Sequence, residues 1–262
     1  DGKLNNQPQI EVVRETGTTA VVDGDGGLGY FPSHRAMSLA MEKALASGMA
    51  ITQSRNHGHF GAAGLYARMA TEHDLLAFVT SGHQLNLQKG DPIYKAAGGS
   101  PMAFSVPSGE KDPLVLDFGA MHDLYASDPH RDEIAALAPG LVLRSIGLGE
   151  ICQIWGGLLS GLCIDPQRRP WAYSGANQGG LFLAFRIDLF RDPAELRAEM
   201  DEYVKRVKGL QPFEGIEGAY MPGGPELERE RPWREEGVPV GESHRQALEE
   251  LHGEQVDASV VD

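Results

Sequence analysis

Two histidines stand two positions apart in the segment SRNHGHFGAAG, which covers residues 54–64. His57 lies between Asn56 and a glycine, whereas His59 stands directly before Phe60 and a run of small residues. An imidazole titrates near neutral pH, so either ring could act as a general acid and base. Small residues at a helix start also let the backbone come close to a ligand. We therefore predict that His59 is an acid/base residue at a strand-to-helix junction, while a packing or surface role stays open for His57.

A zinc-dependent hydrolase is an alternative interpretation of the same pair. His57 and His59 could be two zinc ligands, but such a site needs a third and a fourth ligand. His83, Asp117 or His122 could supply one only if the fold happened to bring it close. We expect no metal site, and the zinc alternative predicts stoichiometric metal and loss of activity with a chelator.

A glycine-rich turn, GDGGLG at residues 24–29, fits the G-x-G-x-x-G pattern of dinucleotide-binding Rossmann folds. In that fold the helix opens within the glycines, but here residues 30–32 (YFP) stand before the expected helix. The following strand ends in residues 53–55 (QSR), without the acid that binds a ribose, although the arginine could suit a 2′-phosphate. A glycine-rich turn is the favoured interpretation, and a Rossmann site is the alternative.

Strand and helix patterns alternate through the first 120 residues, which predicts a three-layer α/β architecture. Residues 11–22 are rich in β-branched side chains and predict a strand pair. Asp192, with Pro193 after it, predicts the capped start of an amphipathic helix that runs to residue 209. Residues 149–162 are almost wholly apolar and predict a buried helix. Further strands are expected at 49–53, 75–80, 102–106, 114–118 and 180–187, and further helices at 33–47, 62–73, 131–138 and 242–251.

Composition narrows the class of protein. The 262 residues are 41% hydrophobic and can bury a full core, but no apolar run reaches the roughly 20 residues that span a bilayer. A net charge of −14 repels phosphate backbones and anionic membranes, so no nucleic-acid or membrane partner is expected. The polar start DGKLNNQPQI is not a signal peptide, which favours a cytoplasmic location. Cys152 and Cys163 are expected to be thiols.

The motifs of the chain, taken in order, resemble the malate/L-lactate dehydrogenase family, which includes sulfolactate, ureidoglycolate and diketogulonate enzymes. The resemblance covers most of the chain and implies an α/β, three-layer fold with a mixed β-sheet, sulfolactate-dehydrogenase-like and not a standard Rossmann fold. It rests on VDGDGGLG (22–29), RN with HFG and AG (55–64), Tyr66, GGSPMAF (98–104), Pro107, VLDFG (115–119), GLLSG (157–161) and Pro222-Gly223.

The resemblance implies an NAD(P)-dependent oxidoreductase that interconverts a 2-hydroxy acid and a 2-oxo acid by hydride transfer. His59 matches the family's general acid/base, the cofactor is NAD or NADP, and the protein is expected to be a homodimer. Two matches have a structural alternative: Arg144 could be a solvated charge beside a helix, and Asp117 a strand-end acid that accepts backbone hydrogen bonds. The expected cofactor-binding residues are Ser81, Gly82, His83, Asp117, Phe118, Gly119 and Arg144, and the expected substrate residues are Asn56 and His122.

The chain departs from the family pattern in three places. The family's N-terminal helical segment, with a Ser-His-Gly motif and an arginine that help to bind the substrate carboxylate, is expected to be absent before Asp1. Gly-Thr-Asn-Pro is replaced by GGSP at residues 98–101, and the region after Asp117 is shortened around a polar cluster of His122, Asp123 and Tyr125. These departures support an alternative function as a catalytically silent relative that binds a dinucleotide or promotes oligomerisation.

The resemblance also sets the expected domain organisation. We expect residues 1–262 to be one catalytic unit with a cofactor-binding core at 18–165. Residues 1–17 and 166–262 are then supporting or dimerisation parts. If the N-terminal segment is absent, Arg35 or a residue of a partner subunit could bind the substrate carboxylate.

Overall fold

The computed structural model describes residues 2–168, 171–216 and 218–252. These residues belong to two compact units, Asp1–Pro222 and Gly223–Asp262. The first unit contains every residue of the predicted site.

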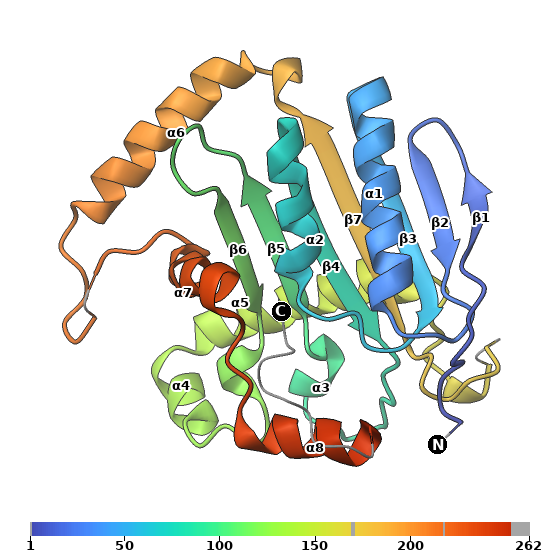
Figure 1. Cartoon of the computed structure of the whole chain (residues 1–262). Coiled ribbons are helices and arrows are strands. Elements are labelled where there is room, and N and C mark those ends of the chain that lie inside the picture. The colour runs from blue at the N-terminus through green and yellow to red at the C-terminus, as the bar shows by residue number, and fades with distance from the viewer. Residues whose placement is uncertain (1, 169–170, 217, 253–262) are drawn as a thin grey trace. The chain divides into compact units, whose positions relative to one another are not determined.

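The first unit is built on a seven-stranded sheet of order β1-β2-β3-β7-β4-β5-β6 (Figure 1). Strands β2 and β3 pair in parallel, and the other neighbours in this sheet are antiparallel. The predicted mixed sheet is therefore confirmed, with the late strand β7 at its centre. The strands are β1 (Glu11–Glu15), β2 (Thr19–Asp23), β3 (Met49–His57), β4 (Leu75–His83), β5 (Pro101–Val106), β6 (Leu114–Gly119) and β7 (Gln178–Arg186).

Helices cover both faces of the sheet, which confirms the predicted three layers. Figure 1 shows α1 (Tyr30–Ser47) and α2 (Ala63–Met69) side by side on one face, and α5 (Pro139–Cys152) behind the other. Helix α1 begins at Tyr30, directly after Gly29, so the predicted start at residue 33 is three residues late. The shorter elements of this unit are η1 (Ala70–His73), α3 (Tyr94–Ala97), η2 (His122–Leu124), α4 (Arg131–Leu137), η3 (Gln153–Leu158), η4 (Pro166–Arg168) and η5 (Ile187–Leu189).

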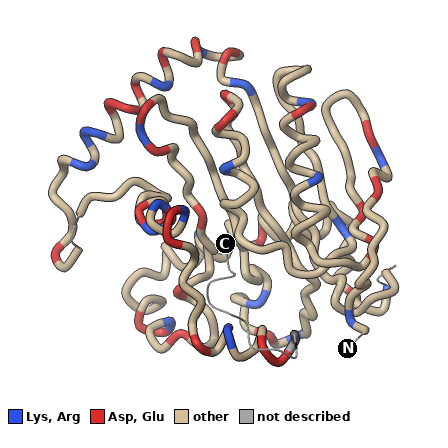
Figure 2. The backbone as a smooth tube through the Cα atoms, viewed as in Figure 1, with Lys and Arg blue, Asp and Glu red and all other residues tan. Residues whose placement is uncertain are grey.

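The main core lies between the sheet and the pair α1 and α2. It is made largely of small and aliphatic side chains, with Phe60, Tyr66 and Phe182 as its large aromatic members. Figure 2 shows that strands β4 and β5 carry almost no charged residues. The charged residues lie mainly on helices and turns, where water solvates them.

Glycines allow the π-helical segment η3 to lie directly against the end of β4. A Cβ atom on Gly156 would lie 2.5 Å from the carbonyl carbon of Ser81, and one on Gly82 would lie 2.6 Å from the backbone nitrogen of Gly157. Contacts this short do not form, so only glycine permits this approach. The contact joins the second helical layer to the end of β4 that leads into the predicted site.

The prediction of a fully buried helix over residues 149–162 is wrong in two respects. Helix α5 ends at Cys152 and continues as η3, so the run is not one regular helix. Only one side of the run is buried, and Trp155 and Leu159 on the other side are 44% and 63% exposed. Apolar composition alone therefore did not reveal that one side of this segment faces outward.

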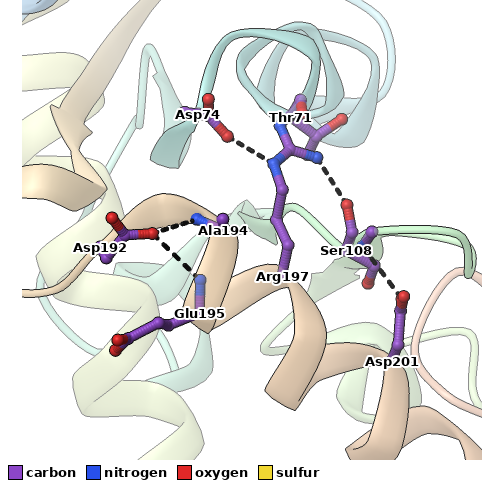
Figure 3. Close-up of polar contacts among 9 residues, drawn as sticks. Thr71, Asp74, Ser108, Asp192, Ala194, Glu195, Arg197 and Asp201 are labelled. Carbon is purple, nitrogen blue, oxygen red and sulfur yellow. Dashed lines mark hydrogen bonds and ion pairs between the residues drawn. The ribbon is translucent and has the colours of Figure 1, made fainter.

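Helix α6 (Pro193–Lys208) begins as predicted and is attached to the turn between β5 and β6. The Asp192 carboxylate accepts hydrogen bonds from two backbone N–H groups in the first turn of the helix. Further along, Arg197 donates to Asp74 and to the Ser108 carbonyl (Figure 3). Asp201 accepts from three backbone N–H groups of residues 109–111. The helix also buries Val204, whereas the neighbouring Tyr203 is 54% exposed.

The second unit contains α7 (Gly224–Glu236) and α8 (Glu242–His252). The predicted helix at 242–251 is confirmed, whereas α7 was not predicted because its start lies in a Pro/Gly-rich passage. Among the described helices, no single one is long and apolar enough to cross a membrane, although the bent pair Arg131–Leu137 and Pro139–Leu158 passes the same test by length and composition.

The glycine contact predicts opposite effects for two alanine substitutions in the same helical run. Gly156→Ala should destabilise the fold by about 1–3 kcal/mol, because the new methyl group overlaps the β4 backbone. Gly147→Ala, where nothing lies within 4 Å, should stabilise it by about 0.5–1 kcal/mol. Urea unfolding of both variants measures the difference, and equal free energies of unfolding would contradict the tight contact.

Candidate active site

The structure gives His57 and His59 different surroundings. His57 is fully buried, its Nε2 lies 2.8 Å from the Ser54 hydroxyl, and its Nδ1 lies 2.8 Å from the Gly58 carbonyl oxygen. A carbonyl only accepts, so Nδ1 carries the proton and the neutral ring accepts from Ser54 through Nε2. Burial lowers the pKa of His57 to about 4 and keeps the ring neutral at physiological pH. His57 is thus a buried, hydrogen-bonded residue, as its packing interpretation predicts.

A bulge in β3 brings Ser54 and His57 together. Residues three apart in a regular strand point to opposite faces, but the pairing of β3 with β7 shifts register between these two positions. Asn56 within the bulge has a left-handed backbone with φ of 54°. Asparagine tolerates this conformation better than most residues, so its type at this position favours the bulge.

The loop of residues 58–60, here called the histidine loop, is bound at three successive carbonyl oxygens. The Gly58 carbonyl accepts from His57 Nδ1, and the His59 carbonyl accepts from the Gly29 N–H at 3.0 Å. The Phe60 carbonyl accepts from the Tyr66 hydroxyl in a short hydrogen bond. One bond comes from the end of β3, one from the start of α1 and one from α2. The backbone on both sides of the His59 side chain is therefore fixed by three separate elements.

The His59 side chain itself is exposed. Its ring meets the edge of Tyr30 in a T-shaped contact, with 6.1 Å between the ring centroids. Tyr30 also covers Gly61, whose φ is +85° and where a Cβ would lie 2.5 Å from the tyrosine ring. The structure thus combines an accessible imidazole with a fixed backbone.

The glycine-rich turn packs against the histidine loop. A Cβ on Gly29 would lie 2.5 Å from the Gly58 carbonyl oxygen and 2.7 Å from that of His59, so glycine allows this contact. The Asp23 carboxylate before the turn accepts from Asn56 Nδ2 at 2.7 Å and from Arg55 Nε at 2.9 Å. Asn56, expected to bind substrate, is thus hydrogen bonded to the turn, while its buried Oδ1 has no partner among the described residues.

Asp117 of β6 contacts the start of α2, 53 positions from Gly64 along the chain. Its Oδ2 accepts the Gly64 N–H at 2.8 Å, which is the backbone hydrogen bond that the structural alternative for Asp117 predicts. The next residue, Phe118, points to the opposite face of the sheet and is 38% exposed. At the end of β6, a Cβ on Gly119 would lie 2.9 Å from the Gly99 carbonyl oxygen. Residues 117–119 therefore connect the helix start with the GGSP loop.

A cavity of about 770 Å³ opens beside this loop, a size typical of small-molecule sites. His83, Gly98 and Gly99 line it, and burial lowers the pKa of His83. Gln84 lines it as well and has a buried Oε1 without a partner among the described residues. Tyr125 lies on another wall and donates its hydroxyl to the Gly99 carbonyl at 3.2 Å. The structure thus gathers His83 and the GGSP loop around one cavity.

The remaining predicted residues lie in different places. Ser81 is buried and Gly82 packs on η3 behind the cavity wall. His122 is exposed and makes a T-shaped contact with Tyr125 at 6.2 Å between centroids. Arg144 is exposed on α5, and no contact described in this structure joins it to the other predicted cofactor residues.

Arg35, the suggested carboxylate-binding residue, faces strand β1. The pKa of Glu15 is lowered, chiefly by its hydrogen bond to Lys43 and to a smaller extent by the charge of Arg35. The guanidinium is therefore close enough to Glu15 to act on it electrostatically. This contact gives Arg35 a role at the edge of the sheet.

Several cavity residues were not predicted from the sequence. Tyr94, Lys95 and Arg131 are among them, and the Arg131 guanidinium carbon lies 5.1 Å from the centre of the Tyr94 ring. Lys95 forms an ion pair with Asp91 at 2.8 Å. Their positions depend on how α3 and α4 fold together, and no motif or periodicity marks them in the sequence.

The geometry does not support the zinc alternative. Both ring nitrogens of His57 are used in hydrogen bonds, so this residue does not offer a ligand atom beside His59. Within the described ranges, no group of three or more histidine, cysteine, aspartate or glutamate side chains could hold a metal ion.

Comparison with known proteins identifies the class of enzyme. The chain is 28% identical over 282 residues to L-sulfolactate dehydrogenase of Methanocaldococcus jannaschii, covering 97% of this chain and 80% of the relative. It is 26% identical over 255 residues to malate dehydrogenase of Pyrococcus abyssi, covering 85% of this chain and 70% of the relative. It is 21% identical over 272 residues to ureidoglycolate dehydrogenase (NAD(+)) of Escherichia coli (strain K12), covering 91% of this chain and 76% of the relative. The fold and these relatives define an oxidoreductase of the hydroxyacid dehydrogenase class.

The family model and the solved structures agree. The model described as malate/L-lactate dehydrogenase matches residues 1–121 and 126–249. The fold resembles malate dehydrogenase from Pyrococcus horikoshii OT3 with a TM-score of 0.79 at 23% identity, covering 96% of this chain and 78% of that one. It also resembles sulfolactate dehydrogenase from Methanocaldococcus jannaschii with a TM-score of 0.73 at 24% identity, covering 96% and 80%. The chain belongs to the malate/L-lactate dehydrogenase family, which confirms the resemblance seen in its motifs.

The buried neutral His57 predicts a specific acid sensitivity. Its pKa is about 4 in the fold and near 6.5 in the unfolded chain, so folding favours the neutral ring. This contribution is complete above pH 6.5 and is lost as the pH falls toward 4, at up to about 1.4 kcal/mol per pH unit. Urea unfolding of wild type and His57→Asn between pH 7.5 and 4.5 measures it. Wild type should lose more stability than the variant, and parallel curves would show that His57 does not titrate as described.

Proposed function

We propose that this protein is an NAD(P)-dependent oxidoreductase that interconverts a 2-hydroxy acid and a 2-oxo acid, with His59 as general acid and base. The observation that carries the proposal is the contrast between the two histidines. His57 is fully buried and neutral. The His59 ring is exposed to solvent, and three hydrogen bonds to carbonyl oxygens fix the loop that carries it. Membership in the hydroxyacid dehydrogenase family supplies the class of reaction.

The residues around the cavity fit a nicotinamide dinucleotide. Lys95 and Arg131 offer positive charge for phosphates in a protein whose net charge is −14. The unpartnered Gln84 Oε1 offers an acceptor, and Gly99 leaves room beside it, since only the Tyr125 hydroxyl at 3.8 Å lies near a Cβ at that position. When bound, the cofactor donates or accepts the hydride. His83 and Gly99 then belong to the walls of its site.

Proton transfer to and from the substrate is carried out by residues of the protein. In the reductive direction, protonated His59 donates a proton to the substrate oxygen as the 2-oxo group is reduced to a hydroxyl. In the oxidative direction the neutral ring takes that proton back. Asp117 holds the start of α2 through Gly64 and, as a carboxylate, can also accept hydrogen bonds from cofactor hydroxyls.

Removal of the His59 imidazole tests the assignment. His59→Ala should lower kcat by about 10² to 10⁴ and leave dinucleotide affinity nearly unchanged. The control is His73→Gln, which alters an exposed histidine at the far end of η1 and should keep the native rate. Absorbance of NADH or NADPH with a panel of 2-oxo acids measures the rate, and fluorescence titration measures dinucleotide affinity.

The outcomes separate the proposed enzyme from a silent relative. Full activity in His59→Ala would refute the assigned role. A native chain that is silent with the whole panel, but is stabilised by about 2.7 kcal/mol at 100 times the dissociation constant of a dinucleotide, would instead support a binding module.

We further propose that the protein works as a homodimer. The sheet face that carries η3 leaves large apolar side chains uncovered, which is uncommon on a monomer. Gln53 of β3 donates to the Trp155 carbonyl and Phe78 of β4 packs on the Trp155 ring, so these strands and η3 form one surface. The exposed apolar residues on this surface are Ile51, Phe104, Phe118, Trp155 and Leu159.

A charge on this surface should prevent association. Leu159→Lys should convert a dimer into a monomer, because a lysine cannot be buried there without a partner for its charge. Leu65→Lys on α2, which is 57% exposed on the opposite face of the sheet, should leave association unchanged. Sedimentation equilibrium measures both variants, and a monomeric wild type or a dimeric Leu159→Lys would contradict the proposal.

A further inference from the structure

We propose that His57 and Tyr66 are positioning residues that hold the His59 backbone in its reactive place through the carbonyls on either side of it. The inference rests on the proposed role of His59 and adds two residues to it. Neither side chain is placed to touch the reacting atoms, since both are buried under the histidine loop.

The two residues act on opposite sides of His59. His57 Nδ1 donates to the carbonyl of Gly58, the residue before it, at 2.8 Å. The Tyr66 hydroxyl donates to the carbonyl of Phe60, the residue after it. His57 thus fixes the Gly58–His59 peptide, the Gly29 N–H fixes the His59–Phe60 peptide, and Tyr66 fixes the next one, Phe60–Gly61. Loss of the His57 donor would free a peptide beside His59, loss of the Tyr66 hydroxyl would free the peptide that follows, and either loss would leave a buried carbonyl without its partner.

Both donors belong to one buried network. The Ser33 hydroxyl of α1 lies 3.3 Å from the Ser54 hydroxyl and is also hydrogen bonded to Tyr66. Because the Gly58 carbonyl can only accept, Nδ1 carries the proton and the Ser54 hydroxyl donates to Nε2. Ser54 therefore supports the tautomer of His57 that donates to Gly58. It joins β3, α1 and α2 below the loop.

The packing of Tyr66 can be separated from its hydrogen bond. Its ring stacks on Phe60 with 5.5 Å between centroids and meets Phe182 edge to face at 5.6 Å. A phenylalanine keeps both ring contacts and loses only the hydroxyl. Thr52→Val is the matched control, because it removes a buried hydroxyl that donates at 2.7 Å to the Ala36 carbonyl of α1, away from the histidine loop.

His57 also allows a conservative replacement. The amide nitrogen of asparagine stands at nearly the same place along the side chain as Nδ1, so His57→Asn can still donate to the Gly58 carbonyl. His57→Leu fills a similar volume and cannot donate. Rescue by asparagine and not by leucine would identify the donor to Gly58 as the feature that matters.

The test is a double-mutant cycle on kcat with saturating NADH or NADPH and the active 2-oxo acid. Tyr66→Phe and His57→Leu should each lower kcat by about 10- to 100-fold, as expected for a displaced catalytic group, without changing dinucleotide affinity. In the His59→Ala background the same substitutions should change kcat by less than about 2-fold, because positioning then has nothing to act on. Thr52→Val should leave kcat unchanged in both backgrounds.

A second readout does not need activity. With ¹³C-labelled histidine, the His59 ring signal, assigned by its loss in His59→Ala, should be single and sharp in wild type and in His57→Asn. It should broaden or split in Tyr66→Phe and in His57→Leu. Unchanged ring signals, or kcat losses of equal size with and without His59, would overturn the inference. Full activity of His59→Ala would instead refute the proposed function. The His59 ring signals would still show whether His57 and Tyr66 position the His59 side chain.

Discussion

The site depends on the hydrogen bonding of three consecutive peptide carbonyls in the histidine loop. A buried carbonyl without a donor costs about 1–3 kcal/mol, so such a loop is stable only where each oxygen meets a donor. Here the donors are an imidazole of β3, a backbone N–H before α1 and a phenol of α2. The same bonds that satisfy the loop fix the spatial relation of the sheet to its two covering helices. Stability and the placement of His59 thus have one physical origin.

Close backbone approach is the second constraint, and glycines at a few positions permit it. Gly29 lets the glycine-rich turn reach the histidine loop, and Gly64 leaves room for the Asp117 carboxylate at the start of α2. Gly98, with φ of +59°, leaves room for Gln153 and His83 beside the cavity. The glycine-rich turn, whose pattern resembles a phosphate-binding fingerprint, therefore serves in part for contact between backbone segments of the same chain. Phosphate binding and close backbone packing both need positions without a side chain, so the same glycine spacing suits either use.

The sequence allowed the sheet, its main helices and the family to be predicted, because periodicity and motif order are local properties. The strand pair at residues 11–22 and the Asp192 cap are examples, and both are confirmed. The burial of His57 was one of two open interpretations, since burial depends on helices that pack over the strand. Tyr94 and Arg131 could not be found, because α3 and α4 bring them to the cavity only in the folded chain. The exposed side of η3 was missed because an apolar residue looks the same whether it faces a core or an uncovered surface.

The different fates of the two histidines follow from backbone geometry. In a regular strand, residues two apart point to the same face, so His57 and His59 would both be buried or both be exposed. Strand β3 ends at His57, and the left-handed Asn56 before it has already turned the chain so that His57 meets Ser54 on the inner face. Gly58 then carries the backbone out of the sheet, and His59 leaves the core. A bulge and a strand end thus bury one imidazole as a hydrogen-bond donor within the fold and leave the other exposed.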